Sequence, residues 1–109
     1  MRQVLSKTAL LKILVIDDHE SVVGGTIDVL RNKYPDAEFI TALTAEQALS
    51  QVSSIQPDLV VMDLSLPESP GKMARPETGV KLLRTLMQHY SSLNIVVQSA
   101  HVRTLVRIR

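Results

Sequence analysis

The stretch KILVIDD, residues 12–18, is an apolar run that ends in two carboxylates, Asp17 and Asp18. A second run, DLVVMD over residues 58–63, ends in Asp63. Both runs have the length of a strand and are almost continuously apolar, which is typical of strands in a parallel sheet with both faces covered. If the two strands are neighbours, we expect their three carboxylates to meet at one edge of the sheet.

Such a group of carboxylates is costly when no cation is present. Two carboxylates about 4 Å apart repel each other by roughly 4 kcal/mol at an effective dielectric constant near 20. The sequence therefore predicts that this edge of the sheet either holds a divalent metal ion or raises the pKa of one of its carboxyl groups.

The composition indicates one small domain over residues 1–109. Hydrophobic residues make up 45% of the chain and charged residues 21%, so we expect a globular protein. The net charge of +1 gives no bulk attraction to nucleic acid or to a membrane surface. The chain has no cysteine, no apolar run near the ~20 residues of a membrane span and no recognisable signal peptide. A cytoplasmic protein without membrane contact is the expectation.

Strand-like and helix-like segments alternate, which is the pattern of an α/β protein with a parallel sheet. We expect strands at about 12–17, 38–43, 59–63 and 94–99, and helices at about 21–33, from a Thr44 cap to about Gln56, and at 78–90. Thr44 and Gln47 have the spacing of a capping box. In the last helix the residues expected to face inward are Val80, Leu83, Leu86, Met87 and Tyr90.

Two segments have weaker patterns. Residues 64–77 form a long loop with three prolines and Gly71, which we expect to run over the surface. Residues 101–109 fit the start of a further helix or a tail, although 105–108 also fit a strand. Gly24 and Gly25, inside the first helix, either permit close packing or are merely tolerated there.

The residues Asp17-Asp18, Asp63-Leu-Ser-Leu-Pro67, Gly79 and Ser99-Ala100 resemble the motifs of a CheY-like response-regulator receiver domain of two-component signalling. The resemblance runs from about Lys12 to Arg103. It implies a flavodoxin-like fold, a three-layer doubly wound parallel sheet of order 2-1-3-4, with residues 1–11 as an N-terminal extension. The family's fifth strand, its Lys and its last helix are missing from the pattern, so we expect strand four to be an open edge.

The resemblance also implies a role for each motif residue. Asp63 would accept a phosphoryl group from a sensor histidine kinase or a phosphotransfer protein. Asp17, Asp18, Asp63 and the backbone carbonyl of Ser65 would hold Mg²⁺. Ser99 would donate a hydrogen bond to a phosphoryl oxygen. The domain would be a signalling switch with at most self-catalysed phosphorylation and dephosphorylation, and its loop at 64–77 is longer than the family usually has.

The run Asp17-Asp18-His19 looks most like receivers that precede helix-turn-helix DNA-binding domains, so DNA binding would belong to a longer parent chain and not to these residues. We expect His19 to be a solvated loop residue near the site rather than a ligand. The main alternative is a switching-deficient, receiver-like module for dimerisation or interaction, with a homodimer through the open strand-four edge. A phosphatase with an aspartyl nucleophile is disfavoured, because Ser65 stands where such enzymes typically have a second Asp.

Overall fold

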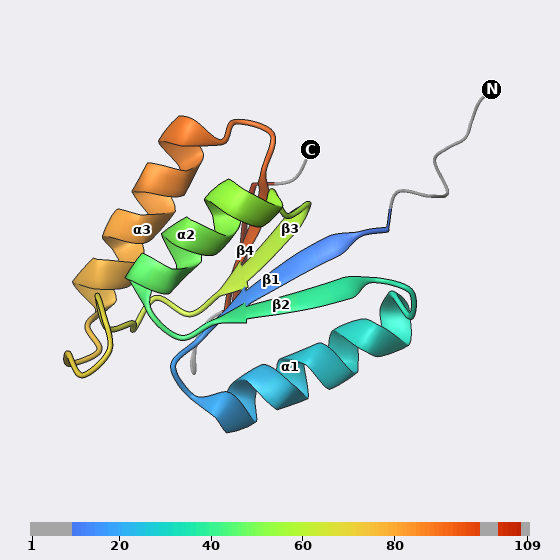
Figure 1. Ribbon diagram of the computed structural model, residues 1–109, viewed down its shortest axis with the longest axis horizontal. Helices are drawn as coiled ribbons and strands as arrows, with labels where there is room; N and C mark the ends of the chain where they lie inside the picture. Colours follow the sequence, from blue (N-terminus) through green and yellow to red (C-terminus); the bar gives the residue numbers. More distant parts are fainter. Residues whose placement is uncertain (1–9, 99–102, 108–109) are drawn as a thin grey trace.

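The structure, a computed structural model, describes residues 10–98 and the backbone of residues 103–107. Its strands form one sheet in the order β2-β1-β3-β4-β5, in which the first four strands are parallel (Figure 1). The predicted α/β fold and the strand order 2-1-3-4 are therefore confirmed. The elements are β1 (Lys12–Ile16), α1 (Glu20–Lys33), β2 (Glu38–Ala42), α2 (Ala45–Ile55), β3 (Leu59–Met62), α3 (Pro76–His89), β4 (Asn94–Gln98) and β5 (Arg103–Arg107).

Strand β1 lies inside the sheet because its side chains are apolar on both faces. Leu14 and Ile16 are buried in the core cluster that also includes residues of α2 and α3, whereas Ile13 and Val15 belong to the cluster that includes Val23 of α1. These four side chains are at most 2% exposed. The alternation of side chains in a strand thus divides one continuous apolar run between two cores.

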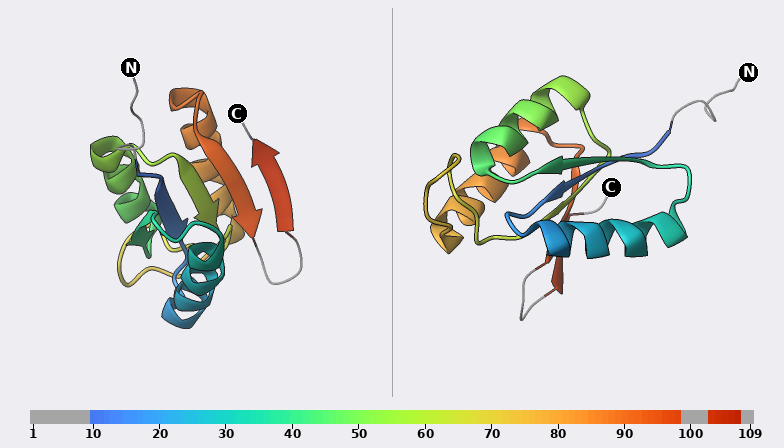
Figure 2. Two further views of the ribbon diagram at one scale, coloured as in Figure 1. Left: turned by 90° about the vertical axis from the view of Figure 1, so that its right-hand side faces the viewer. Right: turned by 60° about the horizontal axis from the view of Figure 1, so that its bottom comes forward.

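The helices divide unevenly between the two faces of the sheet. Helices α2 and α3 lie side by side on one face, and α1 lies alone on the other among the described residues (Figures 1 and 2). In the part of the chain that the structure describes, no helix is long and apolar enough to cross a membrane.

The predicted cap of α2 is confirmed. The Thr44 hydroxyl oxygen accepts a hydrogen bond from the backbone N–H of Gln47 at 3.1 Å. The Gln47 side chain reaches back and accepts one from the N–H of Leu43 at 2.7 Å. This exchange satisfies backbone donors that the first turn of a helix leaves without partners.

The predicted inner face of α3 is partly wrong. The helix begins at Pro76, and its buried residues are Thr78, Gly79, Leu82 and Leu86. Val80 and Met87, which were expected to face inward, are 39% and 38% exposed. The reason is the contact of Gly79 with the backbone that follows β3, which turns the face containing Gly79 toward the sheet.

The expectation of an open edge at strand four is also wrong. Strand β5 pairs antiparallel with β4, with Gln98 opposite Arg103 and Val96 opposite Leu105 (Figure 2). Residues 99–102, which connect the two strands, are enough for a hairpin, whereas another parallel strand would need a crossover of a dozen or more residues. Of the two alternatives left open for residues 101–109, the structure has a strand, at 103–107, and not the start of a helix. Because β5 pairs with β4, the free β4 edge on which the predicted homodimer depends is absent from the described residues.

Candidate functional site

The candidate site lies at the carboxyl ends of β1 and β3. The N–H of Asp17 donates to the carbonyl of Ala42 at 3.1 Å, and the N–H of Asp63 donates to the carbonyl of Ile16 at 2.9 Å. These bonds extend the pairing of β1 with β2 and β3 by one residue. Both aspartates are therefore fixed to the sheet through their backbones, at the edge where open α/β sheets bind ligands.

The structure brings the three predicted carboxylates together. Asp17, Asp18, His19 and Asp63 each offer a ligand atom, and these four atoms lie within 4.8 Å of one another. The Asp17 side chain is 10% exposed and the Asp18 side chain 24%. The predicted cluster at this edge of the sheet is therefore present in the folded chain.

His19 was expected to be a solvated residue near the site, and the structure places its ring in contact with the cluster. Its Nδ1 lies 3.1 Å from Oδ1 of Asp17 and 3.1 Å from Oδ1 of Asp18. Its backbone N–H also donates to Oδ1 of Asp17 at 2.9 Å. The ring stays 62% exposed, so a solvated position near the site is confirmed, and the expectation that His19 is not a ligand stays a prediction. The available signal was a histidine that directly follows two acids.

The site shifts the pKa values of two of its groups. Burial raises the pKa of the Asp63 carboxyl, and the negative charges of Asp17 and Asp18 raise it further, against hydrogen bonds from the backbone of Ser65 and Leu64. The hydrogen bond to Asp17 and the charges of Asp18 and Asp17 raise the pKa of His19. The sequence predicted that this edge of the sheet either holds a divalent metal ion or raises the pKa of a carboxyl group, and the raised pKa of Asp63 agrees with the second of these.

The donor set fits a hard divalent cation. Oδ1 of Asp18 is buried and has no hydrogen-bond partner, although His19 Nδ1 lies at ion-pair distance. A buried carboxylate oxygen without a donor is costly unless a cation or a proton compensates it. Clustered carboxylate oxygens are the ligands that Mg²⁺ prefers in proteins.

The remaining predicted site residues follow β3 and β4. The backbone N–H of Ser65 donates to Oδ1 of Asp63 at 3.2 Å, so Ser65 lies directly beside the site. Its carbonyl as a metal ligand stays a prediction. Ser99 lies outside the described residues, and its predicted role stays a prediction too.

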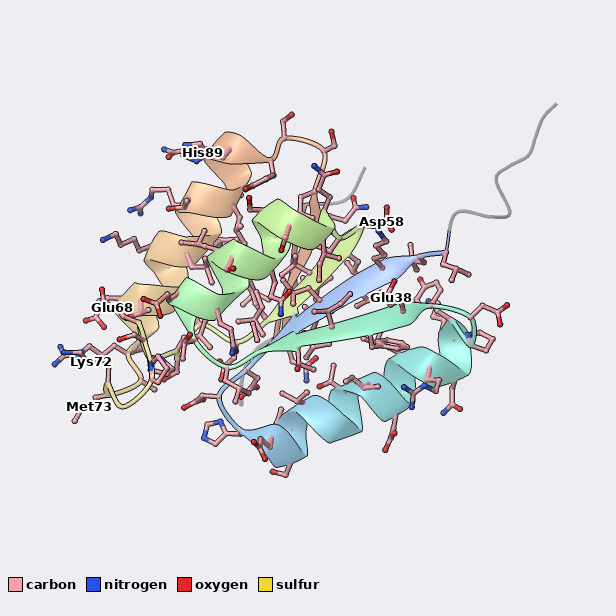
Figure 3. The ribbon with its side chains drawn as sticks, in the orientation of Figure 1. Glu38, Asp58, Glu68, Lys72, Met73 and His89 are labelled. Atoms are coloured by element: carbon pink, nitrogen blue, oxygen red, sulfur yellow. The ribbon has the colours of Figure 1, made fainter. Side chains whose placement is uncertain are left out.

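The long loop after β3 is anchored at both ends. Leu66 and Arg75 exchange two backbone hydrogen bonds, at 3.0 and 3.2 Å. The carbonyls of Pro67 and Glu68 accept from the first two N–H groups of α2. The loop was expected to run over the surface, but its first part is buried and Leu66 is 0% exposed. Only the tip projects, with Met73 74% exposed (Figure 3).

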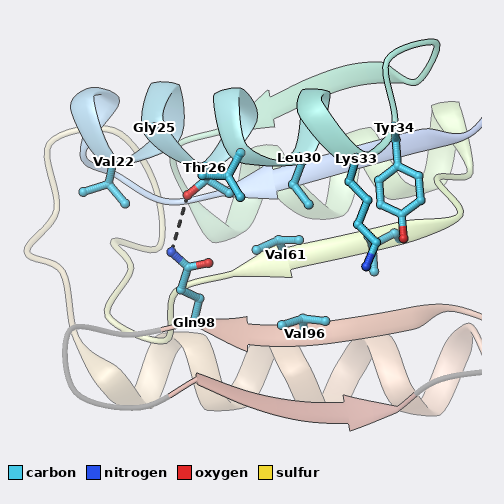
Figure 4. A pocket seen from close by; sticks show the side chains of 11 residues that line it. Val22, Gly25, Thr26, Leu30, Lys33, Tyr34, Val61, Val96 and Gln98 are labelled. Carbon is cyan, nitrogen blue, oxygen red and sulfur yellow. Dashed lines mark hydrogen bonds between the residues drawn. The ribbon is translucent and has the colours of Figure 1, made fainter.

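An apolar hollow lies on the α1 face of the sheet, away from the acidic cluster. It has a volume of about 490 Å³, and its lining includes Val61 and Val96 of the sheet and a stripe along α1 (Figure 4). At one end Gln98 donates to the Thr26 hydroxyl at 3.4 Å. None of the four clustered residues lines this hollow.

Comparison with known proteins agrees with this geometry. The family model of the response regulator receiver domain matches residues 13–109. The chain belongs to this family. Receiver domains are signalling domains of two-component systems, and the predicted family is thereby confirmed.

Among curated proteins, the chain is 26% identical over 93 residues to the DNA-binding transcriptional activator DevR/DosR of Mycobacterium tuberculosis, with 84% of this chain and 39% of that protein covered. It is 30% identical over 92 residues to the uncharacterised transcriptional regulatory protein YhcZ of Bacillus subtilis, with 84% and 39% covered. The chain thus spans about two fifths of the length of these relatives.

Among solved structures, the CheY-like receiver domain protein of Methanospirillum hungatei superposes with a TM-score of 0.70 at 20% identity. The alignment covers 86% of this chain and 67% of that one. At this identity the likeness concerns the fold, and it agrees with the four parallel strands described above.

Proposed function

We propose that this receiver domain is a cytoplasmic phosphoacceptor switch in which Asp63 takes a phosphoryl group from a sensor histidine kinase or a phosphotransfer protein. The observation that carries the proposal is the convergence of Asp17, Asp18 and Asp63 at one edge of the sheet. A structural role alone gives no reason to gather three carboxylates at a place where burial, and then the charges of Asp17 and Asp18, raise the pKa of Asp63.

In the proposed reaction, an Oδ atom of Asp63 attacks the phosphorus of the donor's phosphohistidine. The new bond is O–P, the N–P bond breaks, and its electron pair stays on the imidazole nitrogen. The backbone N–H of Ser65, 3.2 Å from Oδ1 of Asp63, helps to orient the carboxylate. Phosphoryl transfer depends mainly on positioning and on charge neutralisation, so a carboxylate fixed at the end of a strand suits it.

The residues that would hold Mg²⁺ are Asp17, Asp18 and Asp63, together with the carbonyl of Ser65. When bound, the ion supplies positive charge that offsets the carboxylates and the transferring phosphoryl oxygens. Ser99, which follows β4 in the sequence, would donate a hydrogen bond to a phosphoryl oxygen once Asp63 is modified. Phosphorylation of Asp63 would change the charge at this edge of the sheet, and that change would alter a surface that a partner binds.

The test is intact-protein mass after incubation with acetyl phosphate and Mg²⁺. We expect one phosphoryl adduct on the wild type, none on Asp63→Asn, and one on Asp28→Asn. Asp28 is a matched control because it is an exposed aspartate on α1. An adduct on Asp63→Asn equal to that on the wild type would contradict the assignment.

A second candidate function is a receiver-like module that binds a partner without phosphoryl transfer. It is favoured by strand β5, which is antiparallel and carries no Lys in its sequence, where the family has a fifth strand followed by a Lys. Solution size that depends on protein concentration but not on acetyl phosphate would support this candidate. A DNA-binding activity, as in the name of the mycobacterial relative, would belong to a longer parent chain.

A further inference from the structure

Helix α1 leaves apolar side chains uncovered beside the sheet. Val22 and Val29 of α1 line the apolar hollow and are 41% and 69% exposed, whereas Val61 of β3, which also lines it, is 6% exposed. Helix α1 is alone on this face among the described residues, so these side chains border a hollow that is open to solvent (Figure 4). Because transfer of apolar surface out of water is favourable, the hollow favours an apolar occupant.

The two ends of the hollow differ in their polar groups. At one end, Gln98 donates to the Thr26 hydroxyl at 3.4 Å, so these two groups already have each other as partners. At the other end lie Lys33 and Tyr34, with Nζ of Lys33 5.8 Å from the centre of the Tyr34 ring. Both side chains extend from the end of α1 toward the strands (Figure 4). A cation and a hydroxyl donor thus mark one end of the hollow.

The Lys33 ammonium has no acidic partner at this place. No Asp or Glu lines the hollow, and no carboxylate of the described residues lies within 4.0 Å of Lys33 Nζ. A cation at the end of an apolar hollow is complementary to an anionic group on an otherwise apolar ligand. The Tyr34 hydroxyl beside it can donate a hydrogen bond to the same anion.

The dimensions of the hollow fit a long and thin molecule. Its volume of about 490 Å³ lies within the range of roughly 300–1,000 Å³ that is usual for small-molecule sites. Along α1 the lining runs from Val22 to Lys33, which corresponds to roughly 17 Å of helix. Gly25, between these two residues, leaves the middle of the hollow open, because nothing lies within 4 Å of a Cβ added there. An extended acyl chain has this shape.

We propose that the apolar hollow binds a free acyl carboxylate, with its chain along Val29 and Val96 and its carboxylate at Lys33 and Tyr34. The inference does not depend on the proposed phosphoacceptor site, because none of the four clustered residues lines the hollow. It adds a second binding site to the domain and a class of ligand, a fatty acid, for that site.

The test is calorimetric titration of the protein with two ligands that have the same chain length and opposite head groups. Dodecanoate is used below its micelle concentration, and dodecyltrimethylammonium is the cationic counterpart. We expect one dodecanoate per chain. The cationic ligand should bind about fivefold more weakly, since an exposed ion pair changes affinity only modestly.

Two pairs of variants locate the site. Gly25→Leu fills the hollow, whereas Gly24→Leu adds the same side chain outside the lining, and nothing lies within 4 Å of a Cβ added at either glycine. We expect roughly tenfold weaker dodecanoate binding in Gly25→Leu and unchanged binding in Gly24→Leu. Lys33→Met should weaken binding about threefold to fivefold, and Arg31→Met, which removes a charge of α1 outside the lining, should not.

Equal dodecanoate affinity in the wild type and Gly25→Leu would overturn the proposal. Equal affinity of the wild type for the two head groups would overturn it as well, and this comparison needs no variant to fold. A solution size that rises with protein concentration, without dodecanoate binding, would assign the hollow to a second copy of the chain. Binding to phosphatidylglycerol vesicles without binding of dodecanoate would assign it to a membrane surface, and either result would overturn the proposal.

Discussion

Gly79 of α3 lies directly against the carbonyl oxygen of Leu64, the residue that follows Asp63. A Cβ added at Gly79 would overlap the carbonyl and the α-carbon of Leu64. The overlapping atoms are backbone, so they cannot move aside as the end of a flexible side chain can. The contact ties the first turn of α3 to the segment that carries the proposed phosphoacceptor.

Gly79→Ala should therefore be strongly destabilising, and Gly24→Ala should be stabilising. Nothing lies within 4 Å of a Cβ added at Gly24, so that substitution gains helix propensity alone, about 1 kcal/mol. Forced overpacking at Gly79 should cost about 3 kcal/mol. Urea unfolding of both variants measures the difference, and equal midpoints for the two alanine variants would contradict the contact.

Asp63→Asn should stabilise the metal-free protein at neutral pH. Because the pKa of Asp63 is raised in the folded state, its protonated form favours folding below the ordinary value of 3.8, and this contribution is lost as the pH rises through the raised pKa. At neutral pH the ionised Asp63 therefore weakens the fold. We expect the variant to melt a few degrees higher with a chelator present, and the gap to close on acidification. A variant that melts below the wild type at neutral pH would contradict the raised pKa of Asp63.

Mg²⁺ should raise the melting temperature of the wild type. At a concentration 100 times the dissociation constant, binding to the folded state alone stabilises by about 2.7 kcal/mol. We expect Asp17→Asn to lose most of this gain, because Asp17 is the most buried carboxylate of the cluster, and Asp28→Asn to keep it. An equal rise in wild type and Asp17→Asn would place the ion elsewhere.

The long loop should respond differently at its base and at its tip. Leu66 is 0% exposed, so Leu66→Ala should cost about 2–5 kcal/mol. Met73 is 74% exposed, and Met73→Ser should change stability by less than about 0.5 kcal/mol. Chemical denaturation distinguishes the two, and a similar cost for both would mean that the tip is packed.

The central part of the fold and the cluster could be predicted from sequence because they depend on strong local patterns. Continuous apolar runs place β1 and β3 inside a parallel sheet, and their final aspartates must then share an edge. The side-chain contacts of His19 had no such pattern. They depend on how the backbone leaves β1, which the order of residues alone does not specify.

The errors have the same origin. The inner face of α3 depends on the Gly79 contact with Leu64, a tertiary contact between segments 15 residues apart in number, and helical periodicity alone allows a neighbouring face. The antiparallel pairing of β5 with β4 involves a strand, Arg-Thr-Leu-Val-Arg, that has only two strongly apolar residues. Whether such a segment forms a strand depends more on its pairing with β4 than on its own composition.

The central claim is that Asp63 is the phosphoacceptor, and the most direct measurement locates the modified residue. Protein treated with acetyl phosphate and Mg²⁺ is reduced with borohydride, which converts an aspartyl phosphate into homoserine, and is then digested for peptide mass spectrometry. The account predicts homoserine at position 63 and at no other aspartate. Homoserine at Asp17 or Asp18, or none at position 63 in protein that carries a phosphoryl adduct, would contradict it.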